Sequence, residues 1–321
     1  MKKPFIDVAA GLIIRPDGSL LLAQRPPDKP WAGWWELPGG KIETGETVLQ
    51  ALSRELKEEL DIDVTHATPW VTYTHEYEVN IVRLAFCRVT GWTGEPTGIE
   101  GQELAWVDPH GPLNVSPLLP ATEPPLRWLR LPDRYLLTSV SNAQGLSAFM
   151  LRLDQALASG VKLVQFREPG WQDNPAQLEH AFQQVLQRCH ASGALCLVNS
   201  CHPAAWQAQA DGLHLRAGDM TAYQATEQPS KPAGKLLGVS VHNAADLAVA
   251  RALNADFAVL GHVLDTPSHP DQPGMGWDTF ADIAQHAGMP VFAIGGQSMD
   301  SLPIAQQHGA HGIAGIRQIV A

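Results

Sequence analysis

The chain has 321 residues, of which 45% are hydrophobic and 17% charged, so it is long enough to bury two globular cores. Its formal net charge of −11 argues against a duplex nucleic acid as partner, because duplex binding depends on neutralising phosphates with Lys and Arg. The four cysteines show no C-x-x-C spacing, and the sequence has neither a secretory leader nor an apolar run of membrane length. We therefore expect a cytoplasmic protein without membrane contact or direct DNA binding.

The first part of the chain predicts a small α/β domain. Its apolar segments are rich in β-branched and aromatic residues, which favour strands. The predicted strands are Asp7 to Ile14, Leu20 to Gln24, Val71 to Tyr77 and Asn80 to Val89.

The segment from Val48 to Leu60 predicts an amphipathic helix. Its apolar residues recur every three to four positions, which places them on one buried stripe. Thr47 and Gln50 have the spacing of a capping box, and Gly45 permits the tight turn before it. Asp61 follows the helix, and we expect it to adopt the left-handed C-cap conformation at a small cost in stability.

Three glutamates lie together beside the apolar stripe of this helix. Glu55, Glu58 and Glu59 stand at i, i+3 and i+4, so their charges repel one another unless cations neutralise them. Carboxylate oxygens suit Mg²⁺, with Mn²⁺ as the alternative. A solvated acidic face is the other interpretation of such a run. The Gly-rich lead-in and Arg54, whose guanidinium can hold carboxylates in place, favour the metal site.

A proline-rich stretch divides the chain. Five prolines lie between Asn114 and Arg134, where they interrupt regular structure. We place the seam at residues 131 to 133, after a short helix. The two predicted domains are therefore 1–131 and 134–321.

After the seam, short apolar strands alternate with amphipathic helices, beginning with Tyr135-Leu-Leu-Thr and a helix from Leu146 to Ser159. That alternation predicts parallel strands joined by right-handed crossovers. Eight strands are predicted, the number that closes a (β/α)8 barrel of the TIM type. The other seven are Val161 to Arg167, Ala194 to Asn199, Gly212 to Leu215, Leu236 to Val241, Phe257 to Gly261, Pro290 to Ile294 and Gly312 to Ile316.

The chain stops soon after the eighth predicted strand, so we expect a truncated last helix. A barrel without that helix exposes apolar strand surface unless another domain or a second subunit covers it. A homodimer is one arrangement that would do so.

The segment from Gly40 to Ile62 carries a specific motif. It resembles the Nudix box, G-x5-E-x7-R-E-U-x-E-E-x-G-U with U an aliphatic residue, at every defined position except Asp61, where the box has Gly. Over the first ~130 residues, the length of one domain, the chain resembles the MutT-like family, which hydrolyses 8-oxo-dGTP. The further matching stretches are Gln24-Arg25, Trp35 to Glu43, Gly94-Glu95-Pro96, Glu100 to Glu103, Trp106 and Pro120 to Pro124.

This resemblance implies an α/β/α sandwich that uses Mg²⁺ and a nucleoside triphosphate substrate. It makes Glu55, Glu58, Glu59 and Glu100 the catalytic and metal-binding carboxylates, with Gly39 in the metal group. Which carboxylate is the general base is left open. The substrate-binding candidates are Arg25, Glu36, Gly39, Gly40, Lys41 and Thr122.

Base recognition is the part of the pattern that differs. Thr122 stands where the family has an Asn that reads the base, and a hydroxyl offers fewer donors and acceptors than an amide. Selectivity for oxidised guanine is therefore expected to be weaker, altered or supplied elsewhere. Trp31, Trp34 and Trp35 either stack on a base or pack in the core.

The predicted strand ends of the second domain carry another set of matches, at positions where TIM barrels place their chemistry. The matching segments are Tyr135-Leu-Leu-Thr, Val164 to Glu168, Leu197 to Asn199, Gly212 to Leu215, Gly238 to His242, Leu260 to Thr266 and Ala293 to Gly296. From Arg134 to Val320 the chain resembles the thiamine-phosphate-synthase superfamily, particularly its TenI-like thiazole tautomerase branch.

That second resemblance implies a phosphorylated ligand and a proton-shuttling histidine, His242. The other candidates for the second domain are Arg167, Asn199, Gly295 and Gly296. Pro169, Ser200 and a residue around His269 replace two cations and a metal ligand of the family. Those losses are expected to cripple pyrophosphate departure, and with it synthase activity.

One leading hypothesis and two alternatives follow. In the first, a Mg²⁺-dependent hydrolase converts 8-oxo-dGTP, or a dGTP-like nucleotide, to the monophosphate and pyrophosphate, which sanitises the nucleotide pool, and the barrel is a degenerate domain that binds a phosphorylated thiazole or thiamine-type ligand. In the second, the hydrolase acts on thiamine-type pyrophosphates beside a thiazole phosphate tautomerase. In the third, the barrel is a noncatalytic scaffold.

Overall fold

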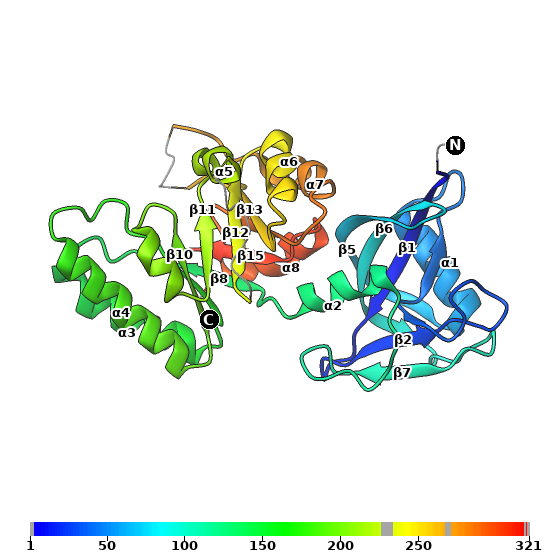
Figure 1. Ribbon diagram of the computed structural model, residues 1–321. Coiled ribbons are helices and arrows are strands. Elements are labelled where there is room, and N and C mark those ends of the chain that lie inside the picture. The colour runs from blue at the N-terminus through cyan, green and yellow to red at the C-terminus, as the bar shows by residue number, and fades with distance from the viewer. Residues whose placement is uncertain (1–2, 226–233, 267–270, 318, 320–321) are drawn as a thin grey trace. The chain divides into compact units, whose positions relative to one another are not determined.

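The chain folds as two compact units (Figure 1). The computed structural model describes residues 3–225, 234–266, 271–317 and 319. Contacts divide the chain into Met1–Leu131 and Pro132–Ala321, and each of the three clusters of buried apolar side chains falls within one unit. Among the residues that are described, no helix is both long and apolar enough to cross a membrane.

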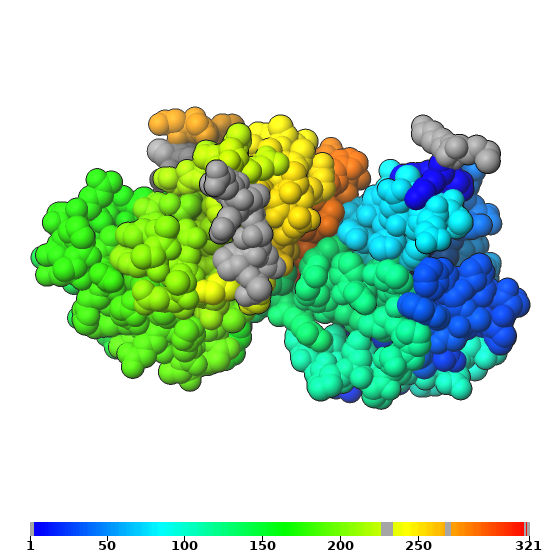
Figure 2. Space-filling view, viewed as in Figure 1, coloured from blue at the N-terminus to red at the C-terminus, as the bar shows by residue number. Residues whose placement is uncertain are grey.

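The first unit contains a four-stranded and a three-stranded sheet, in the orders β4-β1-β6-β5 and β3-β2-β7. Segments distant in sequence therefore meet: β2 pairs with β7, and in Figure 2 the blue and blue-green parts of this unit share one surface. Its elements are β1 Phe5–Ile13, β2 Leu20–Gln24, β3 Trp35–Glu36, β4 Gly39–Lys41, α1 Val48–Leu60, β5 Asp63–Glu76, β6 Ile81–Thr93, β7 Leu104–Val107, η1 Pro120–Thr122 and α2 Glu123–Leu129.

Strand β1 contributes to the core on both of its faces. Ala9 and Ile13 belong to the buried cluster that contains the apolar stripe of α1, whereas Ala10 and Leu12 belong to the cluster that contains Trp128 of α2. Successive side chains of a strand point to opposite faces, so the two helices cover opposite sides of the sheet. The predicted α/β/α sandwich is confirmed.

Helix α1 begins and ends where the sequence predicts. Thr47 Oγ1 accepts the Gln50 N–H at 3.3 Å, and Gln50 Oε1 accepts the Thr47 N–H at 2.9 Å, which completes the capping box. Asp61 adopts the left-handed conformation at φ 54° and ψ 33°, and its N–H donates to Lys57 O. The buried stripe consists of Ala51, Leu52, Leu56 and Leu60. These caps and this stripe set the register of the glutamates.

The second unit is a closed barrel of eight parallel strands, which confirms the predicted TIM-type fold. Figure 1 shows helices outside the strands, and the short 3₁₀ helix η3, Ala204–Ala208, follows β10. The strands are β8 Arg134–Leu137, β9 Leu163–Phe166, β10 Leu195–Asn199, β11 Gly212–Leu215, β12 Leu236–Val241, β13 Phe257–Gly261, β14 Val291–Ile294 and β15 Gly312–Gly315. The α-helices are α3 Leu146–Ala158, α4 Pro175–Ala191, α5 Ala217–Gln224, α6 Ala244–Ala252, α7 Gly276–Ala284 and α8 Leu302–Gln307.

The end of the chain was expected to lack a full last helix. Strand β15 ends at Gly315, and residues 316, 317 and 319 form no helix. Residues 318, 320 and 321 lie outside the described part of the chain, and so does the prediction for them.

Candidate functional site

Two glycines of β4 let the backbone approach α1 and β1. Gly39 has φ +137°, and a Cβ atom there would lie 2.2 Å from Ala9 O. A Cβ on Gly40 would lie 2.3 Å from the carboxyl carbon of Glu55. Only glycine fits at position 39, where the neighbour is backbone, and a side chain at position 40 would displace the Glu55 carboxylate. Lys41 ends the strand, with an exposed side chain.

Arg54 holds the carboxylates of α1 and of the loop before it. Its Nε and Nη2 donate to the two carboxylate oxygens of Glu46 at 2.8 and 2.9 Å. Its Nη1 donates to Glu55 at 2.8 Å and to Glu58 at 3.3 Å, and Nη2 also donates to Lys41 O. The hydrogen bond from Arg54 lowers the pKa of Glu46 to about 2. Arg54 therefore orients the cluster, as predicted.

Glu59 lies deeper than its neighbours. Its Oε2 accepts the Gly39 N–H at 3.1 Å, and burial raises its pKa to about 7. Lys29, in the loop between β2 and β3, lies 3.9 Å from Glu59 Oε1 and contacts Glu100 Oε2. Glu100 comes from the loop between β6 and β7, so three separate segments meet at this point. The structure thus places Glu100 next to the helix carboxylates.

The donor chemistry of this cluster fits a divalent metal ion. Glu55, Glu58 and Glu59 offer hard oxygen ligands on neighbouring positions of one helix. Within the residues described, no group of three or more His, Cys, Asp or Glu side chains is arranged to hold a metal ion. Arg54 and Lys29 instead occupy several of the carboxylate oxygens.

Arg25 and Glu36 form an ion pair next to this cluster. Arg25 Nη1 lies 2.6 Å from both carboxylate oxygens of Glu36, and burial raises the pKa of Glu36 although Arg25 opposes the shift. The backbone of Trp35 binds the segment before η1, since Leu119 N donates to Trp35 O at 2.9 Å. Thr122 follows on that segment and is buried. The structure thus attaches the Thr122 segment to the strand that carries Glu36.

The three neighbouring tryptophans have different environments. Trp35 is buried and belongs to the core. Trp31 and Trp34 form an edge-to-face pair with ring centroids 4.8 Å apart, and Trp31 remains 45% exposed. The core-packing interpretation is therefore confirmed for Trp35, and Trp31 presents an aromatic face to solvent.

The barrel has a cavity of about 810 Å³ at the carboxyl ends of its strands. Arg167, His242, Gly295 and Gly296 line it, so the structure brings four of the five second-domain candidates together. Asn199 is buried and does not belong to the lining, but its Nδ2 donates to the lining residue Gln165 at 2.8 Å.

Other polar residues of this cavity were not predicted from the sequence, among them Gln165, His214, Arg216, Ser240 and Arg317. Three of these, Gln165, His214 and Ser240, lie within the segments that carry the family resemblance, and their place near strand ends was the available signal. Arg216 directly follows β11 and Arg317 lies two residues after the end of β15, where a strand-end rule would have found them.

A chain of hydrogen bonds crosses the barrel interior. Gln165 Nε2 donates to Tyr135 Oη at 2.9 Å, Tyr135 Oη lies 3.1 Å from His214 Nδ1, and His214 Nε2 lies 2.9 Å from Ser240 Oγ. Burial lowers the pKa of His214 to about 3, so the ring is neutral near pH 7. The Gln165 amide donates to the phenol, and each ring nitrogen of His214 faces a hydroxyl group, that of Tyr135 at Nδ1 and that of Ser240 at Nε2.

The tautomer of His242 follows from its contact with the backbone. Its Nδ1 lies 3.1 Å from Gly261 O, and a carbonyl oxygen only accepts, so Nδ1 carries the proton of the neutral ring. The His242 backbone N–H donates to Asp246 at 2.8 Å. Nε2 is then the nitrogen that can accept a proton.

One of the positions at which the barrel departs from the family that it resembles has a side-chain partner. Ser200 Oγ donates to Asp219 at 2.5 Å, and Arg216 donates to both carboxylate oxygens of Asp219. Pro169 supplies no cation. His269 lies outside the described residues.

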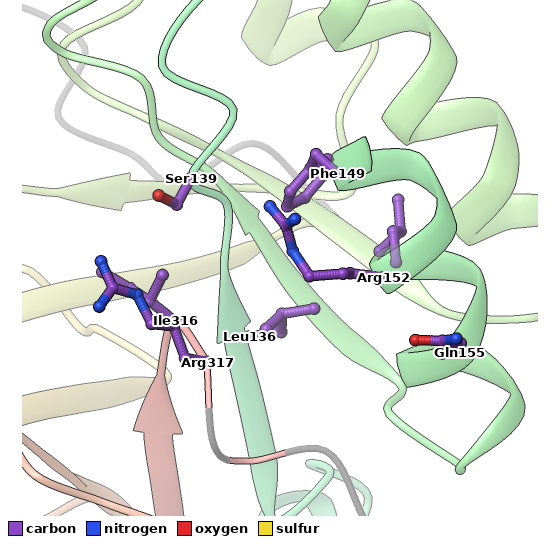
Figure 3. Close-up of a pocket in the computed structure, with 8 residues that line it drawn as sticks. Leu136, Ser139, Phe149, Arg152, Gln155, Ile316 and Arg317 are labelled. Atoms are coloured by element: carbon purple, nitrogen blue, oxygen red, sulfur yellow. The ribbon is translucent and has the colours of Figure 1, made fainter. Parts of the chain in front are cut away.

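A second cavity, of about 510 Å³, lies between β8, α3 and the end of β15 (Figure 3). Ile316 and Arg317 line both cavities. Its lining is Leu136, Ser139, Phe149, Arg152, Leu153, Gln155, Ile316 and Arg317. The candidates predicted from the sequence do not belong to it.

Comparison with known proteins gives separate matches for the two units. The model of the NUDIX domain matches residues 4–129, and that of thiamine monophosphate synthase matches residues 135–319. The 8-oxo-dGTP diphosphatase of Haemophilus influenzae is 44% identical over 110 residues, which cover 34% of this chain and 81% of that protein.

Two relatives of the second unit carry the name thiamine-phosphate synthase. The protein of Synechococcus is 33% identical over 186 residues, 58% of this chain and 52% of the relative, so the chain spans about half of that protein. The putative synthase of Geobacter sulfurreducens is 37% identical over 193 residues, 58% of this chain and 86% of the relative.

The matches to the first unit identify a hydrolase that acts on phosphorus-containing anhydrides. The chain belongs to the Nudix family through its first unit and to the thiamine monophosphate synthase family through its second.

Proposed function

We propose that the first domain, residues 1–131, hydrolyses a nucleoside triphosphate to the monophosphate and pyrophosphate, with 8-oxo-dGTP as its best substrate. The observation that carries this proposal is the carboxylate cluster of α1, oriented by Arg54 beside the Arg25–Glu36 pair. The 44% sequence identity to the 8-oxo-dGTP diphosphatase of Haemophilus influenzae supports the choice of substrate. Removal of such a nucleotide before a polymerase uses it would prevent mutation.

The protein groups divide the work of this reaction. Mg²⁺ or Mn²⁺ held by Glu55, Glu58 and Glu59, with Glu100 and the Gly39 backbone, would add positive charge at the polyphosphate and lower the pKa of water. Arg54 keeps the carboxylates in position.

Further groups would hold the substrate. Arg25, Gly40 and Lys41 would meet the phosphates and sugar, with Arg25 oriented by Glu36. Trp31 and Thr122 would contact the base. The gain in rate comes chiefly from positioning and charge neutralisation.

A hydrolysis panel on the intact chain tests this function. The kcat/KM values for 8-oxo-dGTP, dGTP, other nucleoside triphosphates and thiamine pyrophosphate are compared with and without Mg²⁺. We expect Mg²⁺-dependent release of pyrophosphate and a preference for 8-oxo-dGTP. Absence of turnover for every dGTP-class substrate would refute the proposal, and a preference for thiamine pyrophosphate would favour the thiamine alternative.

We also propose that the second domain, residues 134–321, binds a phosphorylated thiazole or thiamine-type compound in the 810 Å³ cavity. Arg167, Arg216 and Arg317 line that cavity. Gly295 and Gly296 have φ values of +94° and +66°, a conformation in which consecutive N–H groups can face an anion. Titration calorimetry of the intact chain with thiazole phosphate and thiamine phosphate is the test, and indifference to both would leave the scaffold alternative.

A further inference from the structure

Protein cations pair with the carboxylates around the proposed metal position. The pairs are Arg54 with Glu46, Glu55 and Glu58, Arg25 with Glu36, and Lys29 with Glu59 and Glu100. A divalent cation that uses these carboxylates must take the place of at least one protein cation. The protein cation that is held least firmly is the one that a metal ion would displace.

Arg54 is the cation that is most firmly held. Its guanidinium makes five hydrogen bonds to three carboxylates and one carbonyl oxygen. Lys29 differs, because it reaches two carboxylates with one ammonium on a flexible stem, and one of the two distances is 3.9 Å. Lys29 also stands on a loop rather than on a helix or strand. Lys29 is therefore the cation that can leave at the lowest cost.

Removal of Lys29 would leave its two carboxylates close together. The Glu100 loop is attached to the end of α1 without Lys29, because Ile99 N and Gln102 Nε2 both donate to Glu59 O at 3.0 Å. The Glu100 N–H donates to Gln102 Oε1 at 2.8 Å. Two carboxylates held near each other without a counterion attract a divalent cation more strongly.

We propose that Lys29 is the resident counterion of the metal position. Its ammonium neutralises Glu59 and Glu100 in the metal-free protein and competes with the divalent cation. Once the metal displaces it, the ammonium stays within the length of its side chain and meets the polyphosphate of the substrate. This inference rests on the proposed metal-dependent hydrolysis, to which it adds a residue that couples metal binding to nucleotide binding.

The test measures Mn²⁺ binding to the full chain in the absence of nucleotide, by electron paramagnetic resonance. We expect Lys29→Met to lower the Kd for Mn²⁺ by roughly fivefold, the upper range for a partly exposed ion pair. Lys29→Arg keeps the charge and should keep the parent Kd. Lys57→Met is the matched control, because Lys57 lies on α1 with the three glutamates but pairs with Asp61 and Asp63. A damaged fold would weaken metal binding, so a gain in affinity cannot come from misfolding.

The outcomes separate this inference from the proposed function. An unchanged Kd in Lys29→Met, or an equal gain in Lys57→Met, overturns the counterion role. Absence of Mn²⁺ binding to the parent protein refutes the metal-dependent function itself. With nucleotide present, Lys29→Met should raise the KM several-fold although it binds metal more tightly, and an unchanged KM overturns the contact with the polyphosphate.

Discussion

Glu58 is the carboxylate of α1 whose role in turnover can be separated from folding. Its side chain is 60% exposed and touches Arg54 at 3.3 Å, so Glu58→Gln removes charge at nearly the same shape. We expect kcat/KM for the nucleotide to fall on the order of 10²-fold or more, because a metal ligand is lost. Steady-state kinetics at saturating Mg²⁺ and a thermal melt measure the two effects.

Glu78→Gln is the control for this prediction, since Glu78 is an exposed carboxylate of the same unit. It should leave both kcat/KM and the melting temperature unchanged. Unchanged turnover in Glu58→Gln would show that the ligand assignment is wrong.

The buried histidines of the barrel make its stability depend on pH. Burial lowers the pKa of His214 to about 3 and that of His202 to about 4, against 6.5 in the unfolded chain. Below pH 6.5 the unfolded chain binds more protons, so the barrel's free energy of unfolding should fall as the pH falls. The expected slope is about 1.4 kcal/mol per pH unit for each histidine.

Chemical denaturation of the intact chain at several pH values between 7 and 4.5 measures this slope. His214→Gln removes one of the two groups and should reduce the slope of the barrel transition, even though the variant is less stable at pH 7. Equal slopes for the parent and the variant would mean that His214 is protonated in the folded barrel.

At the scale of elements, the one departure from the Nudix box is Asp61, which forms the C-cap of α1. Asp61 adopts φ 54°, a conformation that costs a residue with a side chain more than it costs glycine. Asp61→Gly should stabilise the first unit by roughly 0.5–1 kcal/mol, although it removes the exposed ion pair with Lys57. The kcat/KM should not change, because the catalytic carboxylates lie elsewhere on the helix.

Asp61→Ala is the matched comparison for the cap. Alanine meets the same backbone cost and loses the side-chain contacts, so this variant should melt below the parent. If Asp61→Gly melts below Asp61→Ala, the conformational argument fails.

The elements that local patterns predicted are those whose period or caps are strong. Helix α1 is fixed by its stripe and capping box, and the barrel strands are short apolar runs between helices. Strand β5 shows the limit: it begins at Asp63, eight residues before the predicted Val71. Pro69 and three register shifts interrupt its pattern, and an edge strand tolerates both.

The candidate site was predictable only in part, for a similar reason. Its carboxylates on α1 follow from helical spacing. Lys29 has no such signal, because its place beside Glu59 and Glu100 depends on how two loops fold over the end of the helix. The motif predicts the carboxylates that the chemistry needs. The conformation of the loops determines which cations pair with those carboxylates in the metal-free protein.

At the scale of the whole molecule, the two units have separate cores. The buried clusters of residues 9–128 and of residues 136–319 share no member. We therefore expect two unfolding transitions in scanning calorimetry of the full chain. Mg²⁺ with a non-hydrolysable nucleoside triphosphate should raise the melting temperature of the first unit alone. Its free energy of unfolding should increase by about 2.7 kcal/mol at a ligand concentration of 100 times Kd.

A fragment of residues 1–131 assigns that transition and tests the scaffold alternative. If the barrel does not stabilise the hydrolase, the fragment should melt at the same temperature as the first unit of the full chain. It should also keep the kcat/KM of the full chain. A barrel that stabilises the hydrolase predicts the opposite: the fragment melts earlier, and the nucleotide raises both transitions of the full chain together. Independent cores favour the first result, because stabilisation by ligand extends only as far as the cooperative unit that binds it.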